Sequence, residues 1–506
     1  MEAVSGAVQW AKILDQSRCI GCHACTTACK SENDVPLSVT RTYVKSADVG
    51  VFPNVRRAMQ VTRCNQCENA PCATACPTTA MYVRPDGIVD FDKSICIGCK
   101  ACIAACPYDA IFINPDDHSA EKCNFCAHRI DVGLEPACVT VCPVEAILVG
   151  DLNDPASKVA QMVNRDAVTV RRPEKETHPK VFYKGAHQAT LDPLAAQRPE
   201  GGLYAWAEQP HGPGEIGSGH PHSANSSASI LLSYDVSHKA PWGWRVSAYT
   251  WTKSIASGTY LVAAGLCLTG VLPWSSALFR WTAPLVSGAA LAATGVLLVA
   301  DLKHPERFYL IFTRPQWKSW LVRGAFIIGA YGAVLAAHVL ATLAGAKRCQ
   351  RFLAIAGMPL AAATAGYTGY LFAQAKARDL WQSPMLPPHL LVQAKLAGAA
   401  ALLPFADRRD AKTVAALQLS IAATALAHLA LVAGETTLPH VTAHAKLAVK
   451  NMTRGPQRVP FWLGAALVGV SALAPKLGRW AVPFALAGLA AYEDAYVQAG
   501  QSVPLA

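Results

Sequence analysis

The chain has 506 residues and a formal net charge of +11 at pH 7. Its basic residues do not form patches interleaved with aromatic residues, which argues against nucleic-acid binding. The first 18 residues contain neither an apolar run nor a twin-arginine pair, so no cleavable export signal is expected. Charges and turn residues dominate before about residue 246, and Ala, Leu, Val and Gly dominate after it. This division indicates a soluble domain followed by a membrane domain.

Sixteen of the 18 cysteines form four groups of four in the first domain. In order, the groups are Cys19, Cys22, Cys25 and Cys29; Cys64, Cys67, Cys72 and Cys76; Cys96, Cys99, Cys102 and Cys106; and Cys123, Cys126, Cys138 and Cys142. Three closely spaced thiolates with a remote fourth, often followed by Pro, are typical of [4Fe–4S] ligands. Sixteen such thiolates predict four [4Fe–4S] clusters.

Two other uses of these cysteines fit less well. Disulfides require an oxidising compartment. Zinc sites seldom combine a run of three cysteines with a distant fourth. Groups one and two and groups three and four look like an internal duplication, and short apolar runs follow the Cys-Pro pairs. We therefore predict an α+β, ferredoxin-like, duplicated iron–sulfur domain over residues 1–190.

A linker is predicted over residues 191–245, because residues 209–228 are rich in Gly, Pro, Ser and His. Residues 246–506 are then predicted to form an all-α bundle of eight transmembrane helices. The predicted spans are 254–279, 281–300, 324–345, 352–375, 388–406, 413–434, 459–475 and 480–497. An even number of spans places both ends of this domain on one side of the membrane, here named face A.

Ionisable residues at membrane depth are costly and suggest function. On face A, an alternative for Lys253, His389 and Glu435 is that they only flank their helices at headgroup level. Lys395 lies about a turn and a half inside its span, and the alternative to a functional role is that its side chain snorkels to the interface. His338 is predicted near the opposite face and His428 near face A. Because these two histidines lie at different depths, they are not expected to ligate one haem, and no haem is expected.

Two stretches carry a family resemblance. The segment IVDFDKSICIGC at 88–99, followed by ACPY at 105–108, resembles the electron-transfer subunits of molybdopterin oxidoreductases such as dimethyl sulfoxide reductase and polysulfide reductase. GDLNDP at 150–155 and RRP at 171–173 extend the likeness. The resemblance implies that the fourth ligand of each cluster comes from another group. The implied sets are Cys19, Cys22, Cys25 with Cys142; Cys123, Cys126, Cys138 with Cys29; Cys64, Cys67, Cys72 with Cys106; and Cys96, Cys99, Cys102 with Cys76.

The membrane half resembles the NrfD/PsrC family of polysulfide reductase membrane subunits. The likeness rests on DLKHPERFY at 301–309, YTGY at 367–370, LWQSPMLP at 380–387 and VQAGQSVPL at 497–505. It implies an anchor that binds a quinone on the face carrying the iron–sulfur subunit. From depth and side-chain chemistry, the candidate quinone-binding residues are Asp301, His304, Arg307, His428 and Glu435.

No pterin site and no nucleophile–base pair is visible, so no catalytic residue is predicted in this chain. We predict an electron-transfer and membrane-anchor subunit that connects a separate molybdopterin-type catalytic subunit with quinone in the lipid bilayer. The expected location is the bacterial cytoplasmic membrane, with the iron–sulfur domain facing the cytoplasm. The alternatives are an ion-translocating module, with Lys395, His338 and Glu435 on a proton path, and a scaffold in a larger respiratory complex.

Overall fold

The computed structural model describes residues 7–51, 53–195, 232–233 and 240–505. The chain forms two compact units, Met1–Lys239 with Pro504–Ala506, and Ala240–Val503. Most of the predicted linker, including residues 209–228, lies outside the described residues. Each unit is described by itself.

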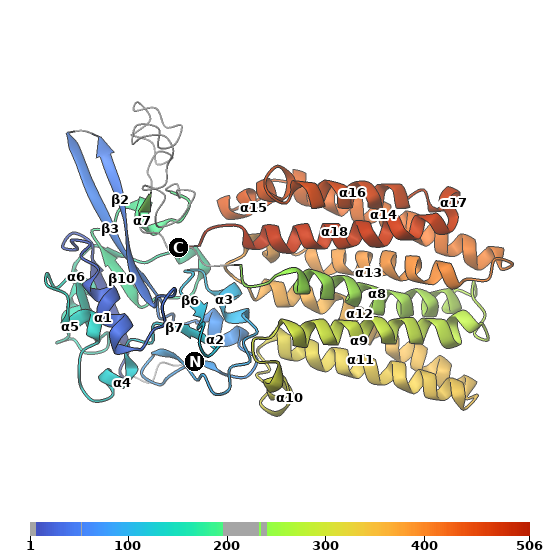
Figure 1. Cartoon of the computed structure of the whole chain (residues 1–506), viewed down its shortest axis with the longest axis horizontal. Helices are drawn as coiled ribbons and strands as arrows, with labels where there is room; N and C mark the ends of the chain where they lie inside the picture. Colours follow the sequence, from blue (N-terminus) through green and yellow to red (C-terminus); the bar gives the residue numbers. More distant parts are fainter. Residues whose placement is uncertain (1–6, 52, 196–231, 234–239, 506) are drawn as a thin grey trace. The chain divides into compact units, whose positions relative to one another are not determined.

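The first unit consists of small sheets and short helices (Figure 1). A four-stranded sheet has the order β8-β1-β10-β9, in which β1 runs parallel to β10 and antiparallel to β8. A long hairpin of β2 and β3 also pairs with β11, while β4 with β5 and β6 with β7 form two-stranded sheets. The elements are β1 Trp10–Asp15, α1 Ala24–Glu32, β2 Thr42–Val51, β3 Asn54–Arg63, α2 Pro71–Ala75, β4 Met81–Val83, β5 Val89–Phe91, α3 Ala101–Ala105, β6 Ile111–Ile113, β7 Ala120–Lys122, α4 Ala127–Ile130, α5 Ala137–Thr140, β8 Ile147–Asp151, α6 Lys158–Arg165, β9 Val168–Thr169, η1 Pro173–Lys175, β10 Val181–Lys184, α7 Gln188–Leu191 and β11 Leu232–Ser233.

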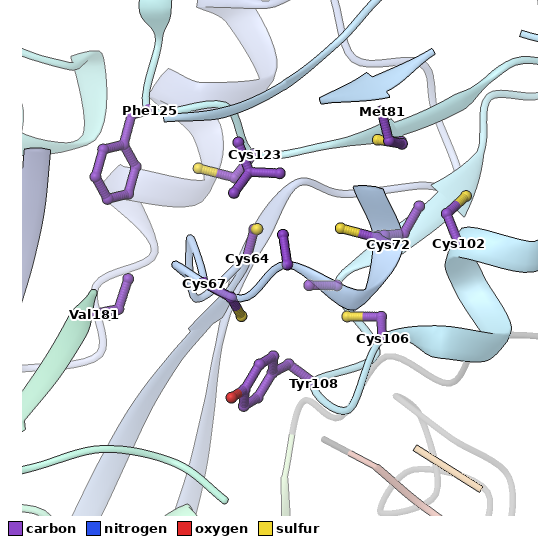
Figure 2. Close-up of a cluster of buried hydrophobic side chains, with 14 of the residues drawn as sticks. Cys64, Cys67, Cys72, Met81, Cys102, Cys106, Tyr108, Cys123, Phe125 and Val181 are labelled. Atoms are coloured by element: carbon purple, nitrogen blue, oxygen red, sulfur yellow. The ribbon is translucent and has the colours of Figure 1, made fainter. Parts of the chain in front are cut away.

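The apolar runs after the Cys-Pro pairs become strands β6 and β8, as the sequence predicts. Short helices begin inside the cysteine groups: α1 in the first, α2 in the second, α3 in the third, and α4 and α5 in the fourth. The core of this unit combines the cysteines with a few aliphatic and aromatic side chains, such as Val181, Tyr108 and Phe125 (Figure 2). This arrangement suits a domain in which metal binding supplies part of the folding free energy.

The second unit is a bundle of long helices. In Figure 1, α8 and α13 lie in the middle, α9 and α11 on one side, and α14, α16 and α18 on the other. The elements are α8 Trp244–Leu268, the π-helical turn η5 Leu278–Thr282, α9 Ala283–Asp301, η6 Pro305–Arg307, α10 Leu310–Thr313, α11 Trp320–Leu343, α12 Lys347–Ala373, η7 Asp379–Gln382, α13 Leu386–Leu402, η8 Leu403–Phe405, α14 Ala411–Thr437, α15 Ala443–Thr453, α16 Arg458–Ser471, α17 Ala474–Leu477, η9 Gly478–Trp480 and α18 Ala481–Gln501.

Five of the described helices are long and apolar enough to cross a membrane: Leu278–Asp301, Trp320–Leu343, Lys347–Ala373, Leu386–Phe405 and Ala411–Thr437. The number rises to six if Arg458–Ser471 and Ala474–Gln501, which are bent by 64° relative to each other, count as one span. The chain is therefore a multi-pass membrane protein, and the count of eight spans stays a prediction.

The boundaries of the first predicted span were wrong. That span was placed at 254–279, but α8 ends at Leu268 and the chain then turns at Gly270, whose φ is +68°. At its other end, α8 begins at Trp244, ahead of the polar residues Thr250 and Lys253. Both side chains are buried between helices and lie within α8.

Candidate functional site

Two cysteine groups wind in the same way. In the first, Gly21 and His23 have φ angles of 69° and 61°, and in the third, Gly98 and Lys100 have φ angles of 66° and 63°. Alternation of left-handed and right-handed residues turns successive backbone N–H groups toward one side and makes an anion-binding concavity. The matching conformations confirm the predicted duplication locally, and they suit loops that wrap a negatively charged group.

Two cavities in this unit are lined by four cysteines each. One has an empty volume of about 330 Å³ and is lined by Cys19, Cys22, Cys25 and Cys142. The other has about 370 Å³ and is lined by Cys76, Cys96, Cys99 and Cys102. In each cavity three cysteines come from one group, and the fourth comes from another group.

A third set lies in the buried core. Figure 2 shows Cys64, Cys67, Cys72 and Cys106 around one space, while the sulfurs of Cys102 and Cys123 are turned to other sides. Burial raises the pKa of Cys67 and Cys106 to about 12 in each case. Burial is the larger cause of both pKa shifts, and the neighbouring thiol of Cys64 contributes to them. These thiols would therefore lose their protons only on binding metal.

The fourth set comprises Cys29, Cys123, Cys126 and Cys138. Burial and the other three thiols raise the pKa of Cys29 to about 12. The side-chain amide of Asn33 donates to the sulfurs of both Cys29 and Cys126, at 3.7 Å each. One amide thus contacts cysteines that are 97 residues apart in the chain.

Backbone amides reach sulfurs in several sets. Such bonds favour the thiolate form and are one means by which proteins tune iron–sulfur sites. The bonds run from Gln66 N to Cys64 Sγ (3.5 Å), Met81 N to Cys76 Sγ (3.4 Å), Ala120 N to Cys96 Sγ (3.4 Å) and Ala146 N to Cys142 Sγ (3.2 Å).

The donor sets fit iron–sulfur cubes better than other groups. All sixteen cysteines are free thiols. Among the residues that the structure describes, no three His, Cys, Asp or Glu side chains converge closely enough to hold a single metal ion. A cube instead spreads its ligands around a larger centre, as the two cavities require.

A buried cation supports the same fit. Arg63 is 1% exposed, and its Nη1 donates to Cys138 Sγ at 3.2 Å, but its Nε and Nη2 have no hydrogen-bond partner among the described residues. Lys12 Nζ donates to the same sulfur at 3.6 Å. Burial alone would raise the pKa of Cys138, yet Lys12 and Arg63 bring it down to about 7. A negatively charged cluster would balance these two cations.

In the membrane unit, buried polar side chains gather where α13, α14 and α18 meet. Glu435 of α14 accepts hydrogen bonds from Tyr492 (3.3 Å) and Tyr496 (3.2 Å) of α18. His389 Nε2 of α13 lies 2.8 Å from His428 Nδ1 of α14, and both rings pack against Tyr492. We name these five residues the α13–α14–α18 cluster.

A cavity adjoins this cluster. It has an empty volume of about 300 Å³, and its lining includes His389, Gln393, Tyr492, Glu493 and Tyr496 together with apolar residues of α12, α13 and α18. The Oε1 of Gln393 and the Oε2 of Glu493 have no hydrogen-bond partner among the described residues. An apolar space with a few convergent polar atoms is typical of small-molecule sites.

Glu493 has a charged neighbour on α8. Lys253 is fully buried, and its Nζ donates to Ala365 O (2.7 Å) and Thr368 Oγ1 (2.8 Å) of α12. Glu493 is the carboxylate near Lys253, and its Oε1 accepts a hydrogen bond from Ser254 Oγ (3.4 Å). Lys253 and His389 thus lie buried between the helices of the bundle.

The five candidate quinone-binding residues predicted from the sequence lie in two separate parts of the membrane unit. His428 and Glu435 belong to the α13–α14–α18 cluster. Asp301 ends α9, and His304 and Arg307 lie in the following turn, where His304 Nδ1 is 2.8 Å from Glu306 Oε1. α9 packs mainly on α8 and α11, whereas α14 packs on α13 and α16.

The residues of the suggested proton path are not brought together. Lys395 is exposed on α13, and His338 of α11 is buried against Tyr260 of α8, with a distance of 2.8 Å between Tyr260 Oη and His338 Nδ1. Glu435 lies on α14 in the cluster already described. Sequence reasoning missed Tyr492 and Tyr496, although their spacing of four residues on one helix, beside Glu493, was a usable signal.

Comparisons with known proteins agree with this geometry. Residues 55–152 match a 4Fe-4S dicluster domain, residues 10–31 a 4Fe-4S binding domain, and residues 233–477 the family described as polysulphide reductase, NrfD. The first part of the chain is 44% identical to a subunit of the tetrathionate reductase of Salmonella typhimurium over 190 residues, which cover 37% of this chain and 76% of that protein.

Two further relatives cover a similar stretch. One, a component of the polysulfide reductase of Wolinella succinogenes, is 43% identical over 179 residues, covering 35% of this chain and 94% of that protein. Protein NrfC of Escherichia coli is 39% identical over 178 residues, covering 35% and 80%. With its cysteine sets and its membrane helices, this polypeptide belongs to the family of iron–sulfur electron-transfer subunits of reductases, joined here to a membrane anchor of the NrfD family.

Proposed function

We propose that this chain conducts electrons through four [4Fe–4S] clusters between a separate molybdopterin-type catalytic subunit and a quinone in the bilayer. The observation that carries the proposal is the cavity beside the α13–α14–α18 cluster, in a chain that also holds sixteen arranged thiols. The clusters would supply one-electron steps, and the membrane residues would supply protons.

The proposed ligand sets follow the four thiol arrangements described above. Each set takes three cysteines from one group and the fourth from another: Cys142 for the first group, Cys106 for the second, Cys76 for the third and Cys29 for the fourth. The two four-cysteine cavities support the first and third assignments. Asn33 supports the fourth, because its amide contacts Cys29 and Cys126.

The proposed quinone site is the cavity of about 300 Å³. A quinone takes up two protons with two electrons, so its ring oxygens need proton donors and acceptors close by. Tyr496 lines the cavity and donates to Glu435, while His389 lines it and contacts His428. A proton can thus move between the cavity and the half-buried carboxylate of Glu435 through one phenol. Asp301, His304 and Arg307 form a second candidate group at the end of α9.

Eight spans remain our proposal for the anchor. The helices α16 and α18 pack along each other and are joined by the short helix α17. We therefore count α16 and α18 as two spans that cross the membrane side by side, and not as one bent span. α8 has 25 residues and is long enough to cross the membrane. Its hydropathy is too low for it to be counted among the five apolar helices, because it carries buried polar side chains such as Lys253.

We also propose that the end of the membrane unit at which α8 begins faces the cytoplasm of the bacterial inner membrane. More Lys and Arg flank the predicted spans at that end than at the other. Reporter fusions after Ala506 and in the loop after α11 would test this orientation. The fusion after Ala506 should report the cytoplasm and the fusion after α11 the periplasm, and the reverse result would refute the proposal.

The decisive experiment uses the full chain in lipid nanodiscs under anaerobic conditions. Quinol is added and cluster reduction is followed by absorbance. Glu435→Gln and Tyr496→Phe should each slow this reduction by about 100-fold, while reduction by dithionite is unchanged. The matched control is Asp407→Asn, whose side chain lies exposed in the loop after α13, outside both candidate groups.

Asp301→Asn combined with His304→Ala tests the second group. If this double variant abolishes quinol-driven reduction and the Glu435 variant does not, the site lies at the end of α9. If all variants react at the wild-type rate, quinone binds at neither place.

A further inference from the structure

The cation pair at Cys138 comes from two distant strands. Arg63 ends β3 and Lys12 lies in the centre of β1, and both side chains are almost fully buried, at 1% and 0% exposure. Both donate to one sulfur, that of Cys138. Lys12 Nζ also lies 4.2 Å from the centre of the Phe125 ring, which fixes the ammonium in the interior.

These two charges lack protein counter-charges. Neither Arg63 nor Lys12 forms an ion pair with a carboxylate among the described residues. Burying an unpaired charge is very costly, so two cations against one thiolate would leave excess positive charge. A cube with four thiolates carries a charge of roughly −2 when oxidised and gains one more negative charge on reduction.

Other buried lysines in the same unit are placed differently. Lys122 Nζ donates to the carbonyl oxygens of Val89 and Cys123, and Lys180 Nζ donates to the carbonyl oxygen of Gly87. Their hydrogen bonds go to backbone carbonyls and not to a thiolate. Cys138 receives two direct hydrogen bonds from cations, whereas Lys122 and Lys180 donate to backbone carbonyls.

We propose that Arg63 and Lys12 raise the reduction potential of the cluster held by Cys29, Cys123, Cys126 and Cys138 above those of the other three clusters. The positive charges stabilise the reduced cluster more than the oxidised one, because reduction adds negative charge at the sulfurs they contact. This cluster then accepts an electron first and stores it within the chain. The inference rests on the ligand assignment of the proposed function.

The test is a redox titration of the full chain followed by electron paramagnetic resonance, with iron measured in parallel. In Arg63→Gln, the reduced-to-oxidised ratio of the highest-potential cluster at fixed potential should fall at least tenfold, which is about 59 mV for one electron. Arg63→Lys keeps a positive charge and should retain most of the wild-type reduction potential. Arg56→Gln is the matched control, since Arg56 lies exposed on the same strand. Lys12→Gln, at the longer distance, should give a smaller shift in the same direction.

Three outcomes would overturn the proposal. One is an unchanged highest potential in Arg63→Gln at full iron content. Another is a shift confined to a lower-potential cluster. The third is loss of four iron from both Gln variants, because the cations would then serve assembly and not potential. Failure of the ligand assignment itself would appear separately, as Cys29→Ser damaging a cluster other than the one held by Cys123, Cys126 and Cys138.

Discussion

His389 and His428 lie 2.8 Å apart, ring nitrogen to ring nitrogen, in the interior of the membrane unit. One nitrogen must donate while the other accepts, so the contact fixes the tautomers of both rings relative to each other. The two rings have different surroundings. His389 lines the cavity, whereas the Nε2 of His428 has no hydrogen-bond partner among the described residues. Tyr492 packs against both rings and donates to Glu435.

The first prediction concerns this pair. His389→Ala removes the ring that separates the cavity from His428, and quinol-driven cluster reduction should slow by about 100-fold. Stopped-flow absorbance measures the rate. Lys395→Gln on the same helix is the control, since Lys395 is exposed and should not affect the reaction. Slowing of the Lys395 variant to the same degree would instead favour a proton path that includes Lys395.

The second prediction concerns metal content. Anaerobically purified protein should contain about 16 iron per chain, from four cubes of four. Iron and acid-labile sulfide assays, normalised to protein by amino-acid analysis, measure this value. A reproducible content near eight, with half of the cysteines titrating as free thiols, would exclude four clusters.

The third prediction concerns the exchange of ligands between groups. Cys76→Ser should damage the cluster of Cys96, Cys99 and Cys102, because Cys76 lines their cavity. The signals of the cluster held by Cys64, Cys67 and Cys72 should persist. Mössbauer and paramagnetic resonance spectra separate the two. Cys349→Ser, at an exposed position outside the four groups, should change neither. Damage confined to the Cys64 cluster would refute the exchange.

The fourth prediction concerns the contact of α8 with α13. A Cβ on Gly258 would lie 1.6 Å from Ala394 O, and one on Gly398 would lie 2.0 Å from the carbonyl carbon of Gly258. Gly258→Ala should therefore push the helices apart and destabilise the membrane unit by about 1–3 kcal/mol. The thermal midpoint in detergent measures the effect. Gly265→Ala on the same helix meets no atom within 4 Å and should be neutral.

Local patterns in the sequence carried most of the iron–sulfur prediction. Cysteine spacing is set by the reach of a short loop, so Cys96, Cys99 and Cys102 could be grouped from sequence alone. That Cys76 completes their set is a long-range fact, and only the family resemblance implied it. The buried cations were not predicted, because Arg63 and Lys12 lie in strands whose alternation does not reveal which sulfur they contact.

In the membrane half, the sequence predicted the positions of the helices better than the side-chain contacts between them. Helices that are apolar on all sides do not show which face is buried. Depth alone placed His428 and Glu435 on one side of the bilayer, but it could not pair them with His389 or with Tyr496. It also grouped them with His304, which lies on a different element. Side-chain pairs between helices depend on rotation about each axis, which depth along the axis does not determine.

The burial of Lys253 has a consequence for how the protein is made. On entering lipid alone, α8 would expose this ammonium at a cost of about 2.5–3.5 kcal/mol. Its hydrogen-bond acceptors arrive with α12, and its charged neighbour Glu493 arrives only with α18, the last long helix to be synthesised. The first helix of the membrane unit to leave the ribosome is therefore among the last to complete its contacts, and release from the insertion machinery before α18 arrives would leave Lys253 without its carboxylate neighbour.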